Sequence, residues 1–231
     1  MLTWGASLQL LPVRRLKIGG PALALAAALL MCAASWFWLH DAFPYLIDYS
    51  EEGYRRYWPD RRSLLAHILG GSIALLAGPF QLWSGLRRRL PRLHRSLGYT
   101  YIAGVALGAS ASFYLTFHTK PDFGLALFVL AVTWWISIAM AYAAVRNGRL
   151  DAHREWMIRS YIVTFAFASY RYGVGLSVFD GLGAGRDASV LWLSWVVPMM
   201  VLELWVQRGR IGPARRSPVA SPSKGTATGI S

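Results

Sequence analysis

Residues 124–145 read GLALFVLAVTWWISIAMAYAAV, a continuous run that contains no charged side chain. A helix of about 20 mainly apolar residues is long enough to cross the hydrocarbon core of a bilayer. This stretch therefore predicts a transmembrane helix, and it raises the question of how many similar stretches surround it.

Five further apolar stretches lie on either side of this run, at residues 19–39, 63–86, 96–117, 157–178 and 188–206. We therefore expect an all-α integral membrane bundle of about six transmembrane helices, with lipid as its main partner. In this scheme residues 1–18 form an N-terminal segment, residues 19–207 the membrane domain and residues 208–231 a tail. The tail is basic at first and then rich in Pro, Ser, Thr and Gly, a composition typical of disorder.

The composition of the whole chain agrees with a membrane location. Of its 231 residues, 55% are hydrophobic and 15% are charged, whereas soluble proteins have about 25% charged residues. The chain also carries 11 Trp, 11 Tyr and 10 Phe, and aromatic rings of this kind gather at the two membrane interfaces. A chain so poor in charge cannot cover a water-facing surface, so most of its surface must face lipid.

Positive charge predicts the orientation. The formal net charge is +13, and the basic residues lie in short clusters between the apolar stretches. With the N-terminus inside, sixteen Lys and Arg fall in the inner segments and six in the outer loops, which matches the excess of positive charge seen in cytoplasmic loops. We expect both termini to be cytoplasmic, and we expect no nucleic-acid partner.

The first apolar stretch is either a secretory signal or an uncleaved anchor. It continues past Ala33 and Ala34 into Trp36, Phe37 and Trp38, which is long for a signal peptide and favours the anchor. The chain has 1 cysteine, so it has no internal disulfide and no cysteine cluster for zinc or iron–sulfur. It also lacks a P-loop, a nucleophile elbow and a HExxH motif. No enzyme class and no oligomeric state follow from these patterns.

Four histidines fall near the ends of the expected helices. His67 lies about one turn inside the outer start of the second helix, and His118 ends the third helix on the same side. His94 and His153 begin the third and fifth helices on the inner side. A separation of 24 residues between His94 and His118 corresponds to about 36 Å along a helix. The histidines therefore predict one pair near each membrane surface.

Polar and small residues share helix faces with these histidines. His153, Ser160, Thr164 and Arg171 lie within about 20° of one face of the fifth helix, which predicts a polar stripe through the membrane. On other helices the neighbours are mostly small: Gly98, Tyr101, Gly108 and Ser112 beside His94, and Gly71, Ala74, Gly78 and Gly85 beside His67. Such surfaces leave room for a flat cofactor, or they allow close helix packing with no cofactor at all.

Two arginines lie within the expected helices, where charge is costly and is usually paired. Arg159 and Glu203 fall about one turn from the inner surface, so a structural ion pair is the favoured interpretation. Arg171 lies nearer the outer surface, where its expected partners are Asp180, Asp187, a carboxylate from the outer loop or an anionic ligand group.

Three motifs carry a family resemblance: HILGGS at residues 67–72, LHRSLGYTY at 93–101 and HREWMIRSY at 153–161. Across about residues 60–180 the chain resembles a bacterial membrane family known as domain of unknown function 2306. The resemblance implies a helical, multi-pass domain in the bacterial inner membrane. It implies no activity.

The chain is also similar, more distantly, to the two-haem transmembrane cytochromes b. In that family four successive helices supply four histidines, the first pairing with the third and the second with the fourth. The similarity implies haem b ligated by His67 with His118 and by His94 with His153. One departure is that His118 ends the third helix instead of lying on the fourth.

The leading hypothesis is a b-type haem protein that transfers electrons across or within the membrane, with a quinol or a cytoplasmic redox partner. His94 and His153 form the safer pair, with Arg95, Arg154 and Arg159 neutralising propionates at the inner surface and Arg171 doing so outside. Two alternatives stay open: a small-solute transporter that uses the polar stripe, and a non-catalytic membrane scaffold or assembly factor.

Overall fold

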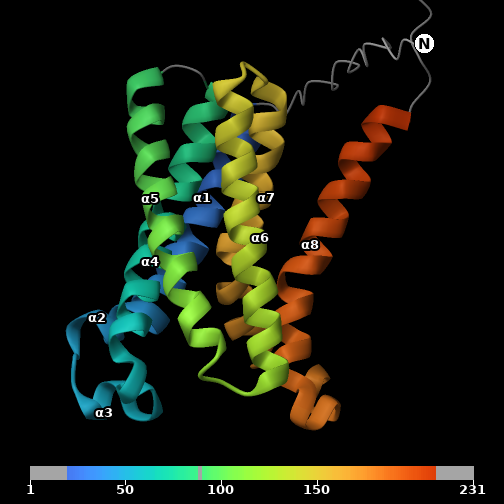
Figure 1. Cartoon of the computed structure of the whole chain (residues 1–231). Coiled ribbons are helices and arrows are strands. Elements are labelled where there is room, and N and C mark those ends of the chain that lie inside the picture. Colours follow the sequence, from blue (N-terminus) through green and yellow to red (C-terminus); the bar gives the residue numbers. More distant parts are fainter. Residues whose placement is uncertain (1–19, 88–89, 212–231) are drawn as a thin grey trace, which may run out of the picture.

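The computed structural model describes residues 20–87 and 90–211, and these residues form a bundle of long helices without strands (Figure 1). Six long helices make up the bundle in this part of the chain: α1 (Gly20–Phe37), α4 (Arg61–Arg87), α5 (Pro91–Thr116), α6 (Pro121–Arg146), α7 (Leu150–Gly173) and α8 (Arg186–Ile211). The predicted all-α fold is confirmed. The segment before residue 20 and the tail after residue 211 lie outside the described residues.

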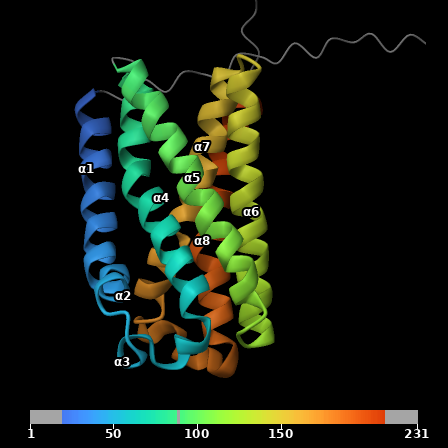
Figure 2. The ribbon, with the colours of Figure 1, turned by 60° about the vertical axis from the view of Figure 1, so that its left-hand side comes forward.

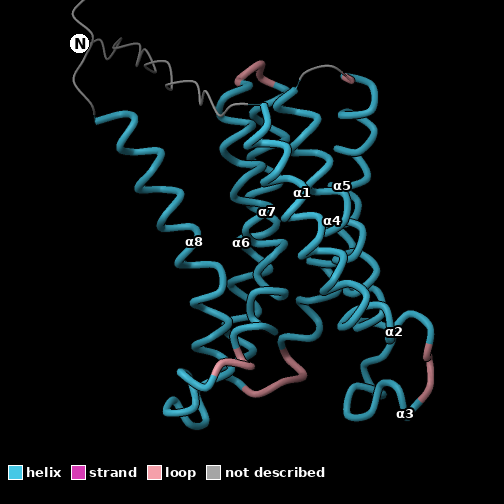
Figure 3. Tube along the Cα trace, turned by 180° about the vertical axis from the view of Figure 1, so that it is seen from behind, coloured by secondary structure: helices cyan, strands magenta, loops and turns pink. Residues whose placement is uncertain are grey.

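Short helical segments join the long helices at one end of the bundle. Figure 3 shows those after α1 looping out beside the start of α4. They are η1 (Trp38–Ala42), α2 (Phe43–Ile47), α3 (Glu51–Tyr54) and η2 (Arg55–Asp60), while η3 (Ser177–Gly185) joins α7 to α8.

Successive long helices run in opposite directions, so the bundle has two distinct ends (Figures 1 and 2). At the end drawn uppermost in Figure 1, α5 and α7 begin, and we call this the His94 end. At the opposite end α4, α6 and α8 begin and α7 finishes, and we call it the Arg171 end. Which end faces the cytoplasm stays a prediction.

Four segments of the described chain are long and apolar enough to cross a membrane: Ala24–Ile47, Glu51–Ser84, Pro121–Arg146 and Ser177–Arg208. The two remaining long helices, α5 and α7, are more polar. Polar side chains inside a bundle need partners that lipid does not provide, and α5 and α7 supply Tyr101, Ser160 and Thr164 to the hydrogen-bond network described below. The chain is therefore an integral membrane protein in which α5 and α7 direct part of their polar side chains into the bundle.

Glycines set the distance between α4 and α5. A Cβ atom on Gly70 would lie 2.3 Å from the backbone nitrogen of Gly108 and 2.6 Å from the carbonyl oxygen of Gly104. Small residues allow this close approach of transmembrane helices. Any side chain at Gly70 would push the helices apart, so this contact fixes how α4 is positioned along α5.

A second close contact joins α4 to α7. A Cβ atom on Gly78 would lie 2.0 Å from the Tyr161 ring, so the ring fills the space beside this glycine. Gly78 shares a helix face with His67, where small residues allow either a cofactor or close packing. At Gly78 the structure shows close packing.

The polar first turns of α7 were not expected from hydropathy. The apolar stretch begins at residue 157, but α7 begins at Leu150. Helix α5 likewise begins at Pro91, with proline in its first turn, where the missing N–H has no helical partner to lose. His94 and His153 therefore each lie about one turn inside a helix instead of at its start.

Candidate functional site

The structure brings His94 and His153 together at the His94 end of the bundle. Their ring centres lie 6.5 Å apart and the ring planes are inclined by 89°. Both side chains are partly buried. Because α5 and α7 both begin at this end, equal distances from their starts place the two rings at the same depth.

Hydrogen bonds fix the tautomer of His153. Its Nδ1 lies 2.9 Å from the carbonyl oxygen of Ala141 on α6. A carbonyl only accepts hydrogen bonds, so Nδ1 carries the proton and donates it. The neutral ring therefore keeps the lone pair of Nε2 available. Metal-binding histidines commonly donate their other ring N–H to a backbone carbonyl in this way.

His94 reaches the same state through Ser84 on α4. The Ser84 hydroxyl donates to the carbonyl oxygen of Gln81 at 3.2 Å, and its Oγ lies 3.0 Å from His94 Nδ1. A hydroxyl has one proton to donate, so Oγ accepts from the Nδ1–H of His94. The Nε2 lone pair of His94 is then also available.

Gln81, one turn before Ser84 on α4, has a buried side-chain amide without a full set of partners. Gln81 is 4% exposed, and its Oε1 has no hydrogen-bond partner among the described residues. A Cβ atom on Gly98 would lie 2.6 Å from Gln81 Nε2, so Gly98 makes room for this amide. Buried oxygens of this kind are usually paired, and an unpaired one suggests a site that receives a ligand.

The three arginines predicted near this pair differ in their availability. Arg95 is exposed, and Arg154 forms an exposed ion pair of 3.1 Å with Asp151. Arg159 is buried and contacts Glu203 through two nitrogens, at 2.5 Å and 2.6 Å. The predicted Arg159–Glu203 ion pair is confirmed, and Arg159 is already neutralised.

The structure does not bring His67 and His118 together. His67 donates from Nδ1 to the carbonyl oxygen of Gly108 at 2.9 Å. Gly108 and His118 are separated by 10 residues, or about 15 Å along a helix. His118 is exposed, stacks on Tyr114 and hydrogen bonds to the carbonyl oxygen of the same residue. His67 therefore packs against α5 in the bundle, while His118 lies at the surface beyond the end of α5.

A closed hydrogen-bond network occupies the centre of the bundle. Thr164 donates to the carbonyl oxygen of Ser160 at 2.9 Å, so its Oγ1 accepts from Trp134 Nε1 at 2.9 Å and from the Tyr101 hydroxyl at 2.7 Å. The Ser160 hydroxyl then donates to Tyr101 at 3.0 Å. Ser160 and Thr164 thus belong to the predicted polar stripe on α7, and the stripe is closed by α5 and α6.

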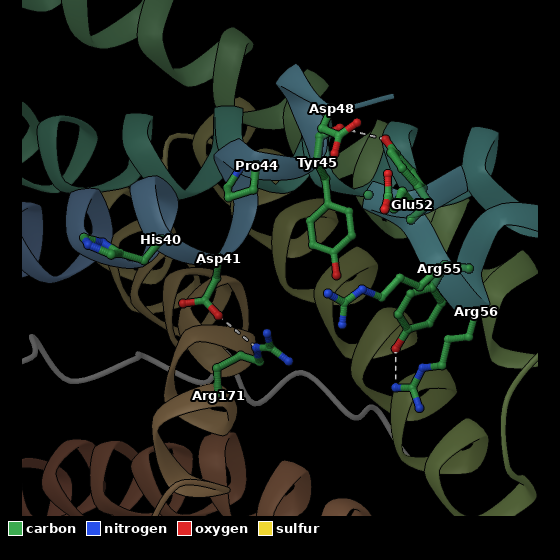
Figure 4. Close-up of a pocket in the computed structure, with 12 residues that line it drawn as sticks. His40, Asp41, Pro44, Tyr45, Asp48, Glu52, Arg55, Arg56 and Arg171 are labelled. Carbon is green, nitrogen blue, oxygen red and sulfur yellow. Dashed lines mark hydrogen bonds and ion pairs between the residues drawn. The ribbon is translucent and has the colours of Figure 1, made fainter. Parts of the chain in front are cut away.

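Arg171 lies at the opposite end, beside a pocket of about 740 Å³ (Figure 4). Its Nε donates to Asp41 Oδ1 at 3.0 Å. Asp41 is in η1, so the expectation of a carboxylate from the outer loop is confirmed. Asp180 pairs instead with Arg186, also at 3.0 Å.

The sequence did not indicate which groups orient the histidine pair, His94 and His153. Ser84 and Gln81 lie near the C-terminal end of α4, and the Ala141 carbonyl belongs to α6. A serine near a helix end carries no distinctive signal, and a backbone carbonyl carries none at all. These contacts depend on how three helices meet.

Comparison with known proteins adds one finding. The family described as "Predicted membrane protein (DUF2306)" matches residues 64–206, which include α5, α6 and α7 and most of α4 and α8. No curated protein and no solved structure matches the chain.

Proposed function

The chain belongs to this family of membrane proteins, and we propose that its histidine pair, His94 and His153, holds one b-type haem for electron transfer within or across the membrane. The observation that carries the proposal is the separation of the two rings. With metal–nitrogen bonds of about 2 Å, imidazoles on opposite sides of one metal ion have ring centres about 6 Å apart. The observed separation is 6.5 Å.

The protonation of both rings supports the same conclusion. Each Nδ1–H is held by an oxygen acceptor on another helix, Ser84 Oγ for His94 and the Ala141 carbonyl for His153. Each Nε2 is therefore the available ligand atom. The hydrogen bonds also hold both rings in place before a metal binds. Groups that hydrogen bond to metal-binding histidines commonly orient a metal site in this way.

The number of protein ligands favours haem over a protein-held metal ion. Among the described residues, no group of three or more His, Cys, Asp or Glu is placed to hold a metal. Zinc sites use at least three protein ligands, whereas a porphyrin supplies its own equatorial nitrogens. A haem held by His94 and His153 would supply electron transfer, which suits two protein imidazoles better than oxygen chemistry does.

Charge and polarity at the His94 end fit the edge of a haem. Arg95 and Arg154 lie at this end as cations for the propionate groups. Gln81 Oε1 lacks a partner in the described protein and would accept a hydrogen bond from an ordered water or a protonated propionate. We leave Arg159 out of the site, because Glu203 and Glu155 already neutralise it.

We further propose a quinol as the electron donor. An apolar pocket of about 220 Å³ lies between α1, α4, α7 and α8, and Ile158 and Tyr161 form part of its wall. Ile158 follows His153 by 5 residues, or about 8 Å along α7. The pocket therefore lies at membrane depth near the histidine pair. Its two serines, Ser169 and Ser194, add polar groups at its wall.

The location follows from the same scheme. We place the protein in the plasma membrane of a bacterium, with both termini and the His94 end in the cytoplasm, because the excess of Lys and Arg lies on that side. A cytoplasmic reductant is the alternative donor at that end.

The closed network at the centre argues against solute transport. Tyr101 and Ser160 are each 0% exposed, and the hydroxyl protons of Tyr101, Ser160 and Thr164 are all committed to neighbours. A polar path through the bundle would require these bonds to break. The second candidate is therefore a scaffold in which the histidines only pack helices together.

Absorption spectroscopy of the purified protein tests the proposal. Protein from haem-supplied cells should be red, with a low-spin spectrum that sharpens on reduction by dithionite. His94→Ala and His153→Ala should each lose the spectrum. His118→Ala is the matched control, because that side chain is exposed and its ring bonds to the carbonyl oxygen of Tyr114 in the last turn of α5. A folded, colourless protein that takes up no added haemin would leave the scaffold as the better explanation.

A further inference from the structure

The pocket at the Arg171 end is built by the segments between α1 and α4. Its lining comes from η1, α2, α3 and η2, with Arg171 closing it from α7. Its volume of about 740 Å³ lies within the range of small-molecule sites, about 300–1,000 Å³. It lies where α1 ends and α4 begins, at the Arg171 end of the bundle.

Hydrogen bonds make the wall of this pocket rigid. Ser50 Oγ donates to Asp48 Oδ1 at 2.5 Å and accepts from the Gly53 amide at 3.0 Å. Tyr54 is 1% exposed and donates to the carbonyl oxygen of Tyr45 at 2.8 Å. A Cβ atom on Gly53 would lie 2.6 Å from the Asp48 carboxylate. These contacts therefore hold the segment from residue 48 to residue 54 in one conformation.

Directly after this rigid segment, Arg55 adopts a strained backbone. Its φ is 49° and its ψ is −122°, and it is the one non-glycine residue with positive φ in the described chain. This region of φ and ψ is largely confined to glycine. Strain of this kind persists where the surrounding structure enforces it, and it concentrates at ligand sites.

The strain directs a guanidinium into the pocket. Figure 4 shows the Arg55 side chain crossing the pocket toward the side where Asp41 and Arg171 lie, whereas Arg56 turns away. Arg56 donates to the Tyr57 hydroxyl at 2.6 Å. Arg171 uses Nε for Asp41, so its terminal nitrogens remain for another acceptor. The Arg55 backbone N–H donates to the carbonyl oxygen of Glu51, but its side chain has no hydrogen bond or ion pair to any other described residue.

We propose that this pocket binds a phosphate group with a single negative charge, held by Arg55 with help from Arg171. A planar guanidinium binds phosphate oxygens through two parallel hydrogen bonds. The acids Asp48 and Glu52 also line the pocket, so a singly charged phosphodiester suits it better than a dianion. This chemistry occurs in phospholipid headgroups at this depth and in soluble glycerophosphodiesters.

Titration of the full chain tests the proposal. Protein in dodecyl maltoside, a detergent without phosphate, is titrated with glycerophosphocholine by calorimetry. A second arm tests whether the phosphodiester comes from a lipid. Protein is extracted from nanodiscs of phosphatidylcholine, and native mass spectrometry counts the lipid molecules that it retains. Binding in either arm supports the site, and the arm that responds identifies the source. No binding in either arm would overturn it.

Two variants make the test specific. Arg55→Gln should weaken binding at least tenfold. Arg55→Gly should weaken it equally while raising the melting temperature, because glycine adopts the positive φ without strain. The matched control is Arg62→Gln, an exposed arginine at the same end that does not line the pocket. If Arg55→Gly binds as well as the unaltered protein, Arg55 is not the ligand-binding residue.

Discussion

The Tyr161 hydroxyl donates a hydrogen bond of 3.1 Å to the carbonyl oxygen of Leu75. That carbonyl would ordinarily accept from the amide four residues later, but residue 79 is proline and has no N–H to donate. In a membrane a carbonyl without a partner is costly, and side chains of neighbouring helices replace the missing donor. Tyr161 on α7 therefore compensates for a proline on α4.

Tyr161→Phe should lower the free energy of unfolding by about 1 kcal/mol, since it leaves the buried Leu75 carbonyl without a partner. Pro79→Ala returns a donor to that carbonyl. In the Pro79→Ala background Tyr161→Phe should therefore lower the free energy of unfolding much less. Thermal unfolding of the unaltered protein, the two single variants and the double variant measures the coupling between the residues. Equal costs in both backgrounds would mean that the tyrosine acts by packing alone.

The central network gives a second stability prediction. Thr164→Val removes the acceptor of both Trp134 Nε1 and the Tyr101 hydroxyl while keeping the side-chain shape. Two buried donors lose a partner, so we expect a loss of about 2 kcal/mol. Thr133→Val is the matched control, because Thr133 donates only to Val129 within its own helix. Thermal unfolding in detergent should show a clear decrease for Thr164→Val and little change for Thr133→Val.

The Arg159–Glu203 ion pair gives a third stability prediction. Glu203→Gln should destabilise the protein by about 2 kcal/mol, less than the 3–5 kcal/mol typical of fully buried pairs, because the Glu203 side chain is 41% exposed. Replacing both residues by leucine should recover much of the loss. If the double variant loses as much as the two single variants combined, the residues contribute independently and the ion pair has no coupling energy.

Helix count and helix rise predicted much of this structure. The apolar stretches gave all six long helices, and the equal distances of His94 and His153 from the starts of α5 and α7 placed them at one depth. The Arg159–Glu203 pair followed from depth in the same way. These predictions succeed because they depend on one helix at a time, where a rise of about 1.5 Å per residue is reliable.

The contacts that depend on the register between helices were not predictable. Gly70 packs against Gly104 and Gly108, and that contact places His67 beside Gly108 instead of beside His118. The sequence shows several glycines on α4 and α5 but does not show which of them meet. The sequence also could not predict the positive φ of Arg55, because this backbone conformation results from tertiary contacts around Tyr54.

Orientation can be measured directly. Reporter fusions near residues 91 and 150 should report the cytoplasm, and those near residues 50, 121 and 184 the opposite side. The reason is that Lys and Arg concentrate at the ends and in the loops that include residues 91 and 150, and such an excess marks the cytoplasmic side. A fusion near residue 220 should match the first group. An outer location for the loop before α5 would reverse the bundle and place the histidine pair on the other surface.

Ser84 provides the sharpest test of how the histidine pair is tuned. By accepting from His94 Nδ1–H, its hydroxyl makes the imidazole a stronger electron donor to a bound metal, and stronger donation stabilises oxidised iron. If the pair holds haem as proposed, Ser84→Ala should therefore keep the low-spin spectrum and raise the midpoint potential by up to about 60 mV, a tenfold change for a one-electron couple.

The control for this prediction is Ser84→Thr, which keeps the hydroxyl and should leave the potential near its original value. Redox titration followed by absorption measures both variants. A purely structural role for Ser84 would lower thermal stability without moving the potential. A fall in potential would mean that the hydroxyl donates to Nδ1, so that His94 binds as an imidazolate instead of a neutral imidazole.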